Sequence, residues 1–271
     1  MAGDKYMAER LGRLEGKVAI VTGAGSRGPG VGNGKATAVL FAREAASVLL
    51  VDAQIERAEE TLAMIEAEGG IASTFQADVT NEEDCKSMVD TAVERYGRLD
   101  VLDNNVGISL RKTVPEIDMD DWDKVQSTNV RSMVLTSRHA IPRMIETGGG
   151  SIVNISSGAG IEAIGDAAYT TSKAAVIGLT IAMAGDHGRD GIRVNCVAPG
   201  VVFTPMVEYR LDSDMRQHRR NSTMLGTEGT AWDVGNAALF LASDDARWIT
   251  GHVLSVDAGM SVISRHAYPN W

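Results

Sequence analysis

Tyr169 and Lys173 stand four residues apart in a stretch with helical periodicity that runs from Ala168 to His187. Residues four apart lie on one face of a helix, so the Lys173 ammonium is expected beside the Tyr169 phenol. A free tyrosine has a pKa of about 10, and a neighbouring cation favours its phenolate form. The pair therefore predicts a general acid/base centred on Tyr169, although on a helix such a pair is more often a surface pair.

Two serines, Ser156 and Ser157, follow an apolar run that ends at Ile155. A hydroxyl group at this place can hydrogen-bond a substrate oxygen and stabilise its developing negative charge. Ser156 precedes Tyr169 by 13 residues and Ser157 precedes it by 12, so both are candidates. The serine that is not used is expected to satisfy backbone groups at the strand end.

A glycine-rich run extends from Gly23 to Gly34, between an apolar run and a helical pattern that begins at Lys35. Glycines let a backbone turn tightly and approach a pyrophosphate, which the free N–H groups of a helix N-terminus attract. A glycine-rich turn without function would have the same composition. Its place between a strand and a helix nevertheless favours a dinucleotide site.

Asp52 ends the next apolar run, 20 residues after Gly32. This is the spacing expected for a carboxylate that accepts a hydrogen bond from the adenosine ribose. A carboxylate there would repel a 2′-phosphate, so the sequence favours NAD over NADP. Arg27 lies in the loop and could pair with a phosphate, but Asp52 carries more weight because a strand fixes its position.

Apolar, β-prone runs alternate along the chain with longer stretches of helical periodicity. The predicted strands are Val18–Val21, Val48–Val51, Ala72–Gln76, Leu99–Leu102, Ser151–Ile155, Arg193–Val197 and Val253–Val256. The predicted helices are Lys35–Glu44, Ile55–Glu68, Glu82–Tyr96, Met119–Ile145, Ala168–His187 and Glu228–Leu241. The alternation indicates an α/β fold: a single doubly wound Rossmann domain, with a seven-stranded parallel sheet and helices on both faces.

The expected organisation has three parts. They are a flexible N-terminal leader over residues 1–13, one domain over 14–260 and a C-terminal tail over 261–271, with a substrate lid at about 203–229. Ligands of such sheets bind beyond the carboxyl ends of the strands, so the chemistry is expected at strand ends.

The chain of 271 residues is acidic, with 26 lysines and arginines against 36 aspartates and glutamates. Such a surface repels phosphate backbones, so no nucleic-acid partner is expected. The longest apolar run, Ala174–Gly185, is shorter than the about 20 residues that cross a bilayer, so no membrane insertion is expected. Cys85, Cys196 and five scattered histidines show no metal-ligand spacing, so we expect no metal site and a reducing, cytoplasmic location.

The sequence resembles the short-chain dehydrogenase/reductase family, in which Thr-Gly-x-x-x-Gly-x-Gly follows the first strand. Here Gly23 opens the pattern and Gly32 and Gly34 match its later glycines after five extra residues; Gly30 and Gly32 are the rival placement. Asp78-Val79, Asn104-Asn105-Val106-Gly107 and Pro199-Gly200-Val201-Val202-Phe203-Thr204 match the family at later strand ends. The resemblance implies NAD bound by Gly23, Gly32, Asn33, Gly34, Asp52, Asp78, Val79, Asn105, Gly107, Tyr169, Lys173, Pro199, Gly200, Val202 and Thr204.

The resemblance also implies a catalytic set of Asn129, Ser157, Tyr169 and Lys173. Ser157 matches by strand register and by the glycines that follow it, whereas Ser156 has the family's usual spacing to the tyrosine. Asn129 would kink a long helix and, with water, link Lys173 to solvent, while Lys173 would also hold the nicotinamide ribose. The implied activity is NAD(H)-dependent interconversion of a small secondary alcohol and a ketone by a homotetramer.

The predicted lid combines an apolar wall with a basic cluster made of Arg210, Arg216, His218, Arg219 and Arg220. The cluster indicates either recognition of an anionic substrate or a solvated helix face. Two other functions stay open at this point. One is epimerisation or dehydration in the same site, and the other is a cofactor-binding sensor with idle chemistry.

Overall fold

The computed structural model describes residues 12–162, 164–208 and 211–262. Most of the predicted leader and tail lies outside these residues, as does Arg210 of the basic cluster. Within them, seven parallel strands form one sheet in the order β3-β2-β1-β4-β5-β6-β9, which confirms the predicted α/β fold. The strands are β1 (Val18–Thr22), β2 (Ser47–Asp52), β3 (Ile71–Gln76), β4 (Val101–Asn104), β5 (Gly150–Ile155), β6 (Ile192–Pro199) and β9 (Val253–Val256).

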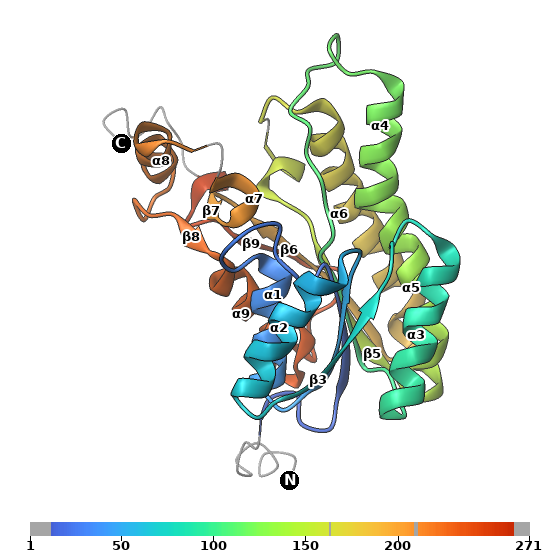
Figure 1. The fold of residues 1–271 in the computed structure, drawn as a ribbon. Coiled ribbons are helices and arrows are strands. Elements are labelled where there is room, and N and C mark those ends of the chain that lie inside the picture. The colour runs from blue at the N-terminus through green and yellow to red at the C-terminus, as the bar shows by residue number, and fades with distance from the viewer. Residues whose placement is uncertain (1–11, 163, 209–210, 263–271) are drawn as a thin grey trace.

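Helices cover both faces of the sheet (Figure 1). One face carries α1 (Asn33–Arg43), α2 (Ile55–Ala67) and α9 (Ala231–Ala242). The other carries α3 (Glu82–Tyr96), α5 (Ser132–Glu146) and α6 (Ala167–His187). Because both faces are buried, the inner strands read as continuous apolar runs rather than as an alternation of apolar and polar residues.

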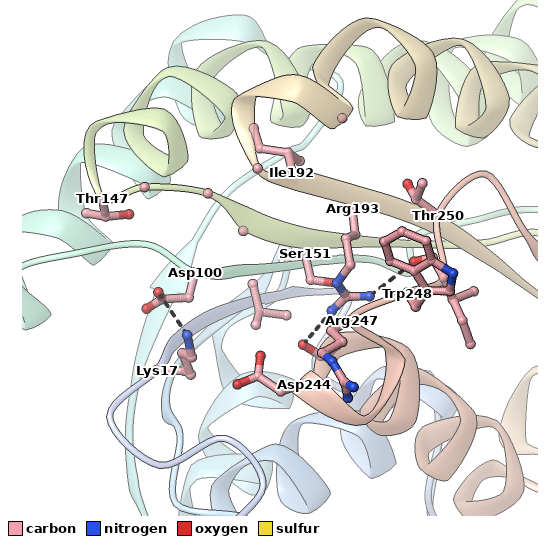
Figure 2. A pocket seen from close by; sticks show the side chains of 18 of the residues that line it. Lys17, Asp100, Thr147, Ser151, Ile192, Arg193, Asp244, Arg247, Trp248 and Thr250 are labelled. Carbon is pink, nitrogen blue, oxygen red and sulfur yellow. Dashed lines mark hydrogen bonds and ion pairs between the residues drawn. The ribbon is translucent and has the colours of Figure 1, made fainter. Parts of the chain in front are cut away.

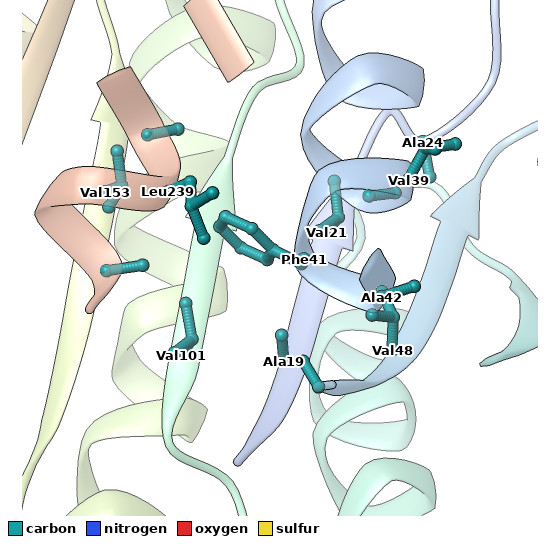
Figure 3. Close-up of a cluster of buried hydrophobic side chains, with 14 of the residues drawn as sticks. Ala19, Val21, Ala24, Val39, Phe41, Ala42, Val48, Val101, Val153 and Leu239 are labelled. Atoms are coloured by element: carbon teal, nitrogen blue, oxygen red, sulfur yellow. The ribbon is translucent and has the colours of Figure 1, made fainter. Parts of the chain in front are cut away.

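The alternation is instead between two cores. Ala19 and Val21 of β1 enter the core under α1 and α9, whereas Val18 and Ile20 enter the core under α3, α5 and α6. Figure 3 shows Phe41 of α1 and Leu239 of α9 lying over Val101 of β4. This packing fixes the sheet from both sides and leaves the loops at its carboxyl edge to form a site.

The sheet reverses its direction of winding at β1, which pairs with β2 on one side and with β4 on the other. The loops that follow β1 and β4 therefore separate at this point and leave a crevice for a ligand. The glycine-rich run follows β1, and Asn105 and Gly107 follow β4. The fold thus brings the predicted cofactor residues to one edge.

Two predicted helices differ from the structure. The helix expected over Met119–Ile145 is α4 (Met119–Gln126), a π-helical turn (Ser127–Arg131) and then α5. The helix expected from Glu228 begins at Ala231, because Thr230 and Asp233 form a capping box at its start.

The lid region holds short elements that no periodicity indicated: β7 (Val202–Phe203), α7 (Pro205–Glu208), α8 (Ser213–Asn221) and β8 (Gly229–Thr230). β7 and β8 pair with each other in parallel, separately from the main sheet. In Figure 1 these orange elements stand beside the loops at the carboxyl edge of the sheet.

Candidate active site

The glycine-rich loop packs so closely that two of its residues admit no side chain. A Cβ on Gly34 would overlap the carbonyl oxygen of Gly23, and a Cβ on Gly25 would overlap Arg57. Gly32 is the N-cap of α1, and its N–H donates to the Ser26 hydroxyl at 2.8 Å. The enlarged loop is therefore folded against the helix start, as a pyrophosphate cradle requires.

The tip of this loop reaches across to two other segments. The Arg27 guanidinium donates to the carbonyl oxygen of Gly107 at 3.0 Å. A Cβ on Gly30 would lie 3.4 Å from the Pro205 ring, so the loop also borders α7. Arg27 is thus directed toward the loop after β4.

A cavity of about 480 Å³ lies among these loops. Among the predicted cofactor residues, ten line it: Gly23, Gly32, Asn33, Gly34, Asp52, Asp78, Val79, Asn105, Gly107 and Thr204. The predicted catalytic residues and Pro199, Gly200 and Val202 are not part of its lining. The two sets meet at Gly107, where an added Cβ would lie 3.2 Å from Lys173 Nζ.

Asp52 is half-buried at the end of β2, and its carboxylate accepts from the N–H groups of Gly25 at 3.1 Å and Gln54 at 3.0 Å. It therefore braces the glycine-rich loop and still borders the cavity. Sequence reasoning missed Arg57, which borders the cavity and packs against Gly25. Its position, five residues after Asp52 in the first turns of the next helix, could have indicated that it borders the cofactor cavity.

Lys173 is 3% exposed, and its Nζ donates to the carbonyl oxygen of Ile155, the last residue of β5, at 2.8 Å. The same Nζ lies 5.6 Å from the centroid of the Tyr169 ring, so the predicted neighbours do meet. Burial lowers the pKa of Lys173 to about 8.

Tyr169 lies in the first turn of α6, and a hydrogen bond joins its side chain to that of Ser157. Burial raises the pKa of the phenol above its ordinary value, Asp166 raises it further, and the bond to Ser157 opposes them. The expected net lowering is therefore not reached in this structure, because burial has the largest effect on this pKa and the Lys173 ammonium is not among the charges that shift it.

The two candidate serines have different partners. The Ser156 hydroxyl is buried and donates to the carbonyl oxygen of Lys173 at 2.7 Å, which holds β5 against α6. The Ser157 oxygen accepts from the Ala159 N–H at 3.2 Å and faces the Tyr169 phenol. Ser157 is thus the hydroxyl group beside the phenol, and Ser156 makes the backbone contact expected of an unused strand-end serine.

Asn129 is fully buried in the π-helical turn, which interrupts the helix where the sequence predicted a kink. Its Nδ2 donates to the Ile108 carbonyl and to the Ser172 hydroxyl, both at 2.9 Å, and its Oδ1 accepts from the Ile108 N–H at 2.8 Å. An added Cβ on Gly107 would lie 3.6 Å from this Oδ1. Asn129 thus ties the loop after β4 to the helix that carries Tyr169 and Lys173.

Asp166 was also missed by sequence reasoning. It is 2% exposed and accepts from the Tyr169 N–H at 3.1 Å, so it caps the helix on which the phenol stands. Its other oxygen accepts from Ser109 Oγ at 2.7 Å and from the Arg111 N–H at 2.8 Å. An aspartate three residues before Tyr169 was the available signal for a helix N-cap.

The segment after β6 approaches the same site. The Gly200 N–H donates to the Val256 carbonyl at 3.0 Å, which anchors the segment that follows Pro199 to β9. Val202 is buried in β7, and Thr204 is 9% exposed and borders the cavity.

The lid arginines are engaged within the protein. Arg216 and Arg219 both pair with Glu228, whose side chain is 4% exposed, and Arg220 lies 3.6 Å from the same carboxylate. The acidic partner of the described cluster is therefore a residue of the chain itself. Because these arginines are already paired with Glu228, they no longer support the hypothesis that the substrate is an anion.

A second cavity, of about 620 Å³, lies at the amino ends of β1, β4, β5 and β6. Figure 2 shows Lys17 pointing toward Asp100 there, with Arg193 among backbone groups. Arg193 donates to the carbonyls of Leu241 and Ser243, and Asp100 accepts from Arg98 at 2.6 Å. Because these groups make structural contacts, we place the site at the opposite edge of the sheet.

Two further searches concern the described residues alone. No group of three or more histidine, cysteine, aspartate or glutamate side chains there could hold a metal ion. None of the helices in these residues has the length and apolar character needed to cross a membrane.

Comparisons with known proteins cover most of the chain. A family model described as enoyl-(acyl-carrier-protein) reductase matches residues 30–261. The chain is 38% identical over 251 residues to 3-oxoacyl-(acyl-carrier-protein) reductase of Thermotoga maritima, covering 92% of this chain and 100% of that protein. It is 40% identical over 251 residues to cyclopentanol dehydrogenase of a Comamonas species, covering 92% and 98%. A 7α-hydroxysteroid dehydrogenase solved with NADH and 7-oxoglycochenodeoxycholic acid has a TM-score of 0.87 and 35% identity, covering 92% of this chain and 96% of that one.

Proposed function

This chain belongs to the short-chain dehydrogenase/reductase family, and on that premise we propose that it is an NAD(H)-dependent enzyme that interconverts a secondary alcohol and a ketone. One observation carries the proposal. The Tyr169 phenol is hydrogen-bonded to Ser157, with the buried Lys173 ammonium 5.6 Å from its ring, at the edge where the cofactor cavity lies.

In oxidation Tyr169 takes the proton of the substrate hydroxyl, and in reduction it returns that proton to the carbonyl oxygen. Ser157 donates to the same oxygen and stabilises the negative charge that develops on it. NAD(H), when bound, supplies or accepts the hydride. We assign Asn129, with water, to a proton path between Lys173 and solvent. Its side chain holds the Ile108 backbone, and the adjacent Gly107 lies close to both Lys173 Nζ and Asn129 Oδ1.

The pKa of Tyr169 determines how this proton moves. Burial raises that pKa, so the phenolate needed for oxidation forms only with help from positive charge. Lys173 supplies part of this charge, and the ring of an oxidised nicotinamide would add to it. Oxidation is therefore expected to speed up as the pH rises, and reduction as it falls.

The cavity residues fit a dinucleotide. Gly34 leaves no room for a side chain beside the N-terminus of α1, and Gly23 has a positive φ of 63°, as a tight turn beside a close pyrophosphate requires. Asp52 borders the cavity with a carboxylate that suits ribose hydroxyls and repels a 2′-phosphate, which supports NAD over NADP. The 7α-hydroxysteroid dehydrogenase relative was solved with NADH.

The substrate class rests on the same site and on the relatives. Their names include cyclopentanol dehydrogenase and borneol dehydrogenase, so we infer a neutral secondary alcohol or its ketone. By family resemblance we further propose a homotetramer. A cytoplasmic location is proposed as well, and the two buried free thiols, Cys85 and Cys196, fit a reducing compartment.

The test is a panel of secondary alcohols and ketones offered with NAD and with NADP, followed at the NADH absorbance band. We expect one mole of NADH per mole of ketone formed and a higher kcat/KM with NAD. Product formation without change in NADH would indicate epimerisation or dehydration. NADH binding without turnover of any member would favour a sensor, and a preference for NADP would refute the role of Asp52.

A further inference from the structure

Glu228 is a buried carboxylate directly before β8. Two arginines of α8 bracket it: Arg219 Nε lies 2.7 Å from Oε1 and Arg216 Nε lies 2.9 Å from Oε2. Burial acts to raise the pKa of Glu228, but the hydrogen bonds from Arg219 and Arg216 outweigh it, and the pKa lies below the ordinary value. The carboxylate is therefore charged at neutral pH, and both ends of the pair carry charge.

Both arginines also contact β7. Arg219 Nη2 donates to the carbonyl oxygen of Val202 at 2.9 Å. The Arg216 guanidinium lies over the Phe203 ring, 3.8 Å from its centroid. Glu228 thus holds a pair of side chains whose other contacts are with Val202 and Phe203, the residues that lead into Thr204.

The backbone ladder that holds this segment is short, although Val202 is buried in the core and Gly200 is bonded to β9. β7 is two residues long, and its partner β8, which follows Glu228 directly, is also two residues long. Two-residue ladders contribute few hydrogen bonds and are not stable on their own. The ion pairs of Arg216 and Arg219 join α8 to Glu228, the residue before β8. Removal of one partner would leave a charge in a poorly solvated place.

We propose that Glu228 is a positioning residue, which through Arg219 fixes Val202–Thr204 for the nicotinamide end of the cofactor. The proposal rests on the proposed function, in which the Val202 backbone and the Thr204 hydroxyl hold the nicotinamide amide. Glu228 touches neither cofactor nor substrate in this role. It sets the place of the groups that do, and it couples the cofactor site to lid helix α8.

The test compares Glu228→Gln with Glu208→Gln. Both changes remove one negative charge from the lid, but Glu208 is exposed on α7. Dissociation constants are measured for NADH and for ADP-ribose, which lacks the nicotinamide ring. Glu228→Gln should weaken NADH about tenfold, the loss of one charge-assisted contact, and change ADP-ribose less than about twofold. Glu208→Gln should change neither.

Limited trypsin digestion adds a readout that needs no cofactor. Glu228→Gln should speed cleavage within α8, after Arg216 and Arg219, because the helix is no longer fastened to β7. Arg219→Ala should reproduce the loss of NADH affinity and should speed cleavage after Arg216, since this variant lacks the cleavage site at 219. Arg219→Lys should restore most of the NADH affinity by keeping the charge. A far-UV circular dichroism spectrum and a thermal midpoint check that each variant folds.

Several results would overturn the inference. Equal losses of NADH and ADP-ribose in Glu228→Gln would mean a general loss of structure, and indistinguishable glutamate variants would mean no positioning role. An unchanged trypsin pattern would show that the pair does not fasten α8. A wild-type protein that bound no NADH would refute the proposed function, and the digestion would then still decide whether the pair holds the lid.

Discussion

The two edges of the sheet each carry a cavity, and they differ in what their buried charged groups contact. The amino edge has the larger one, about 620 Å³ against about 480 Å³. There Arg193 and Asp100 are engaged with backbone carbonyls and with Arg98. At the carboxyl edge Lys173 has a carbonyl as its hydrogen-bond acceptor, and burial moves its pKa to about 8. Burial also lowers the pKa of Arg193, so neither cavity size nor a shifted pKa distinguishes the two edges. The difference is that Lys173 also lies 5.6 Å from the centroid of the Tyr169 ring.

One strand shows the same contrast on a smaller scale. Asp100, just before β4, accepts from the Val18 N–H at 2.9 Å and from Arg98. Asp103, within β4, has two buried carboxyl oxygens without a hydrogen-bond partner, and burial raises its pKa to about 8. The first aspartate stabilises the fold, and the second costs stability wherever it ionises.

The largest effect should come from Tyr169→Phe, which removes the proposed proton carrier. We expect turnover to fall by about a thousandfold, with NADH affinity nearly unchanged. The control is Tyr96→Phe, because the Tyr96 hydroxyl contacts Ser73, away from the cavity. Steady-state rates and NADH fluorescence titration measure the two quantities. Retention of a tenth of the wild-type turnover would place the acid/base elsewhere.

Replacing Asp100 or Asp103 by valine should change the free energy of unfolding in opposite directions. Asp100→Val should lower the free energy of unfolding by about 3 kcal/mol, because it strands the partners of a buried charge. Asp103→Val should raise it by about 2 kcal/mol, because it removes an unpaired buried polar group. Urea denaturation at pH 7 measures both. Two losses of equal size would remove the contrast.

The pH dependence of the free energy of unfolding independently tests whether Asp103 destabilises the folded chain. The pKa of Asp103 is higher in the folded chain, at about 8, than its reference value of 3.8. Its contribution to stability is therefore complete below pH 3.8 and is lost as the pH rises through about 8. The Asp103→Val variant should not show this decline.

Glycines at the two edges should respond differently to alanine. Gly34→Ala places a methyl group against the Gly23 carbonyl and should weaken NADH binding more than about tenfold. Gly188 borders the amino-edge cavity with a helical φ of −60° and open space around it. Gly188→Ala should leave binding unchanged and add up to about 1 kcal/mol of stability. Isothermal titration and thermal melts check both, and equal binding constants would contradict the cradle.

The smallest effect concerns Lys173. Its pKa falls from 10.5 to about 8 on folding, so the unfolded chain binds more protons between these values and stability rises with pH there. Lys173→Met should therefore be more stable than wild type by about 1 kcal/mol at pH 7, with the difference shrinking toward pH 10. The control is Lys35→Met, which loses a pair with Glu60 and should be less stable. A Lys173→Met variant less stable than wild type at pH 7 would contradict burial as the cause.

Sequence patterns predicted the sheet and most helices because each strand contains a continuous apolar run and each of these helices is long enough to show helical periodicity. Tyr169 and Lys173 are four residues apart, and the glycines directly precede α1. Because both patterns involve residues close in sequence, the approach of Lys173 to Tyr169 and the position of the glycine-rich loop were also predictable. The choice between Ser156 and Ser157 was not, since a shift of one residue reverses the direction of a strand side chain. The pairing within the predicted lid was missed for a different reason: Arg216 and Glu228 stand 12 residues apart and meet only in the folded chain. Asp103 directly follows the predicted strand Leu99–Leu102, and no neighbouring residue in the sequence indicated that its carboxyl group would be buried without a hydrogen-bond partner.

The π-helical turn between α4 and α5 has a consequence for how the chain can change length. Such a turn accommodates one residue more than an α-helix does, which offsets the two flanking helices in phase by about 100°. With this offset Asn129 meets the Ile108 backbone while Met133 and Met144 face the interior. Deleting a single residue from 127–131 would restore a regular helix. Either Asn129 would then lose the Ile108 backbone, or Met133 and Met144 would turn away from the interior. The number of residues in this turn therefore determines both the position of Asn129 and the face that α5 buries.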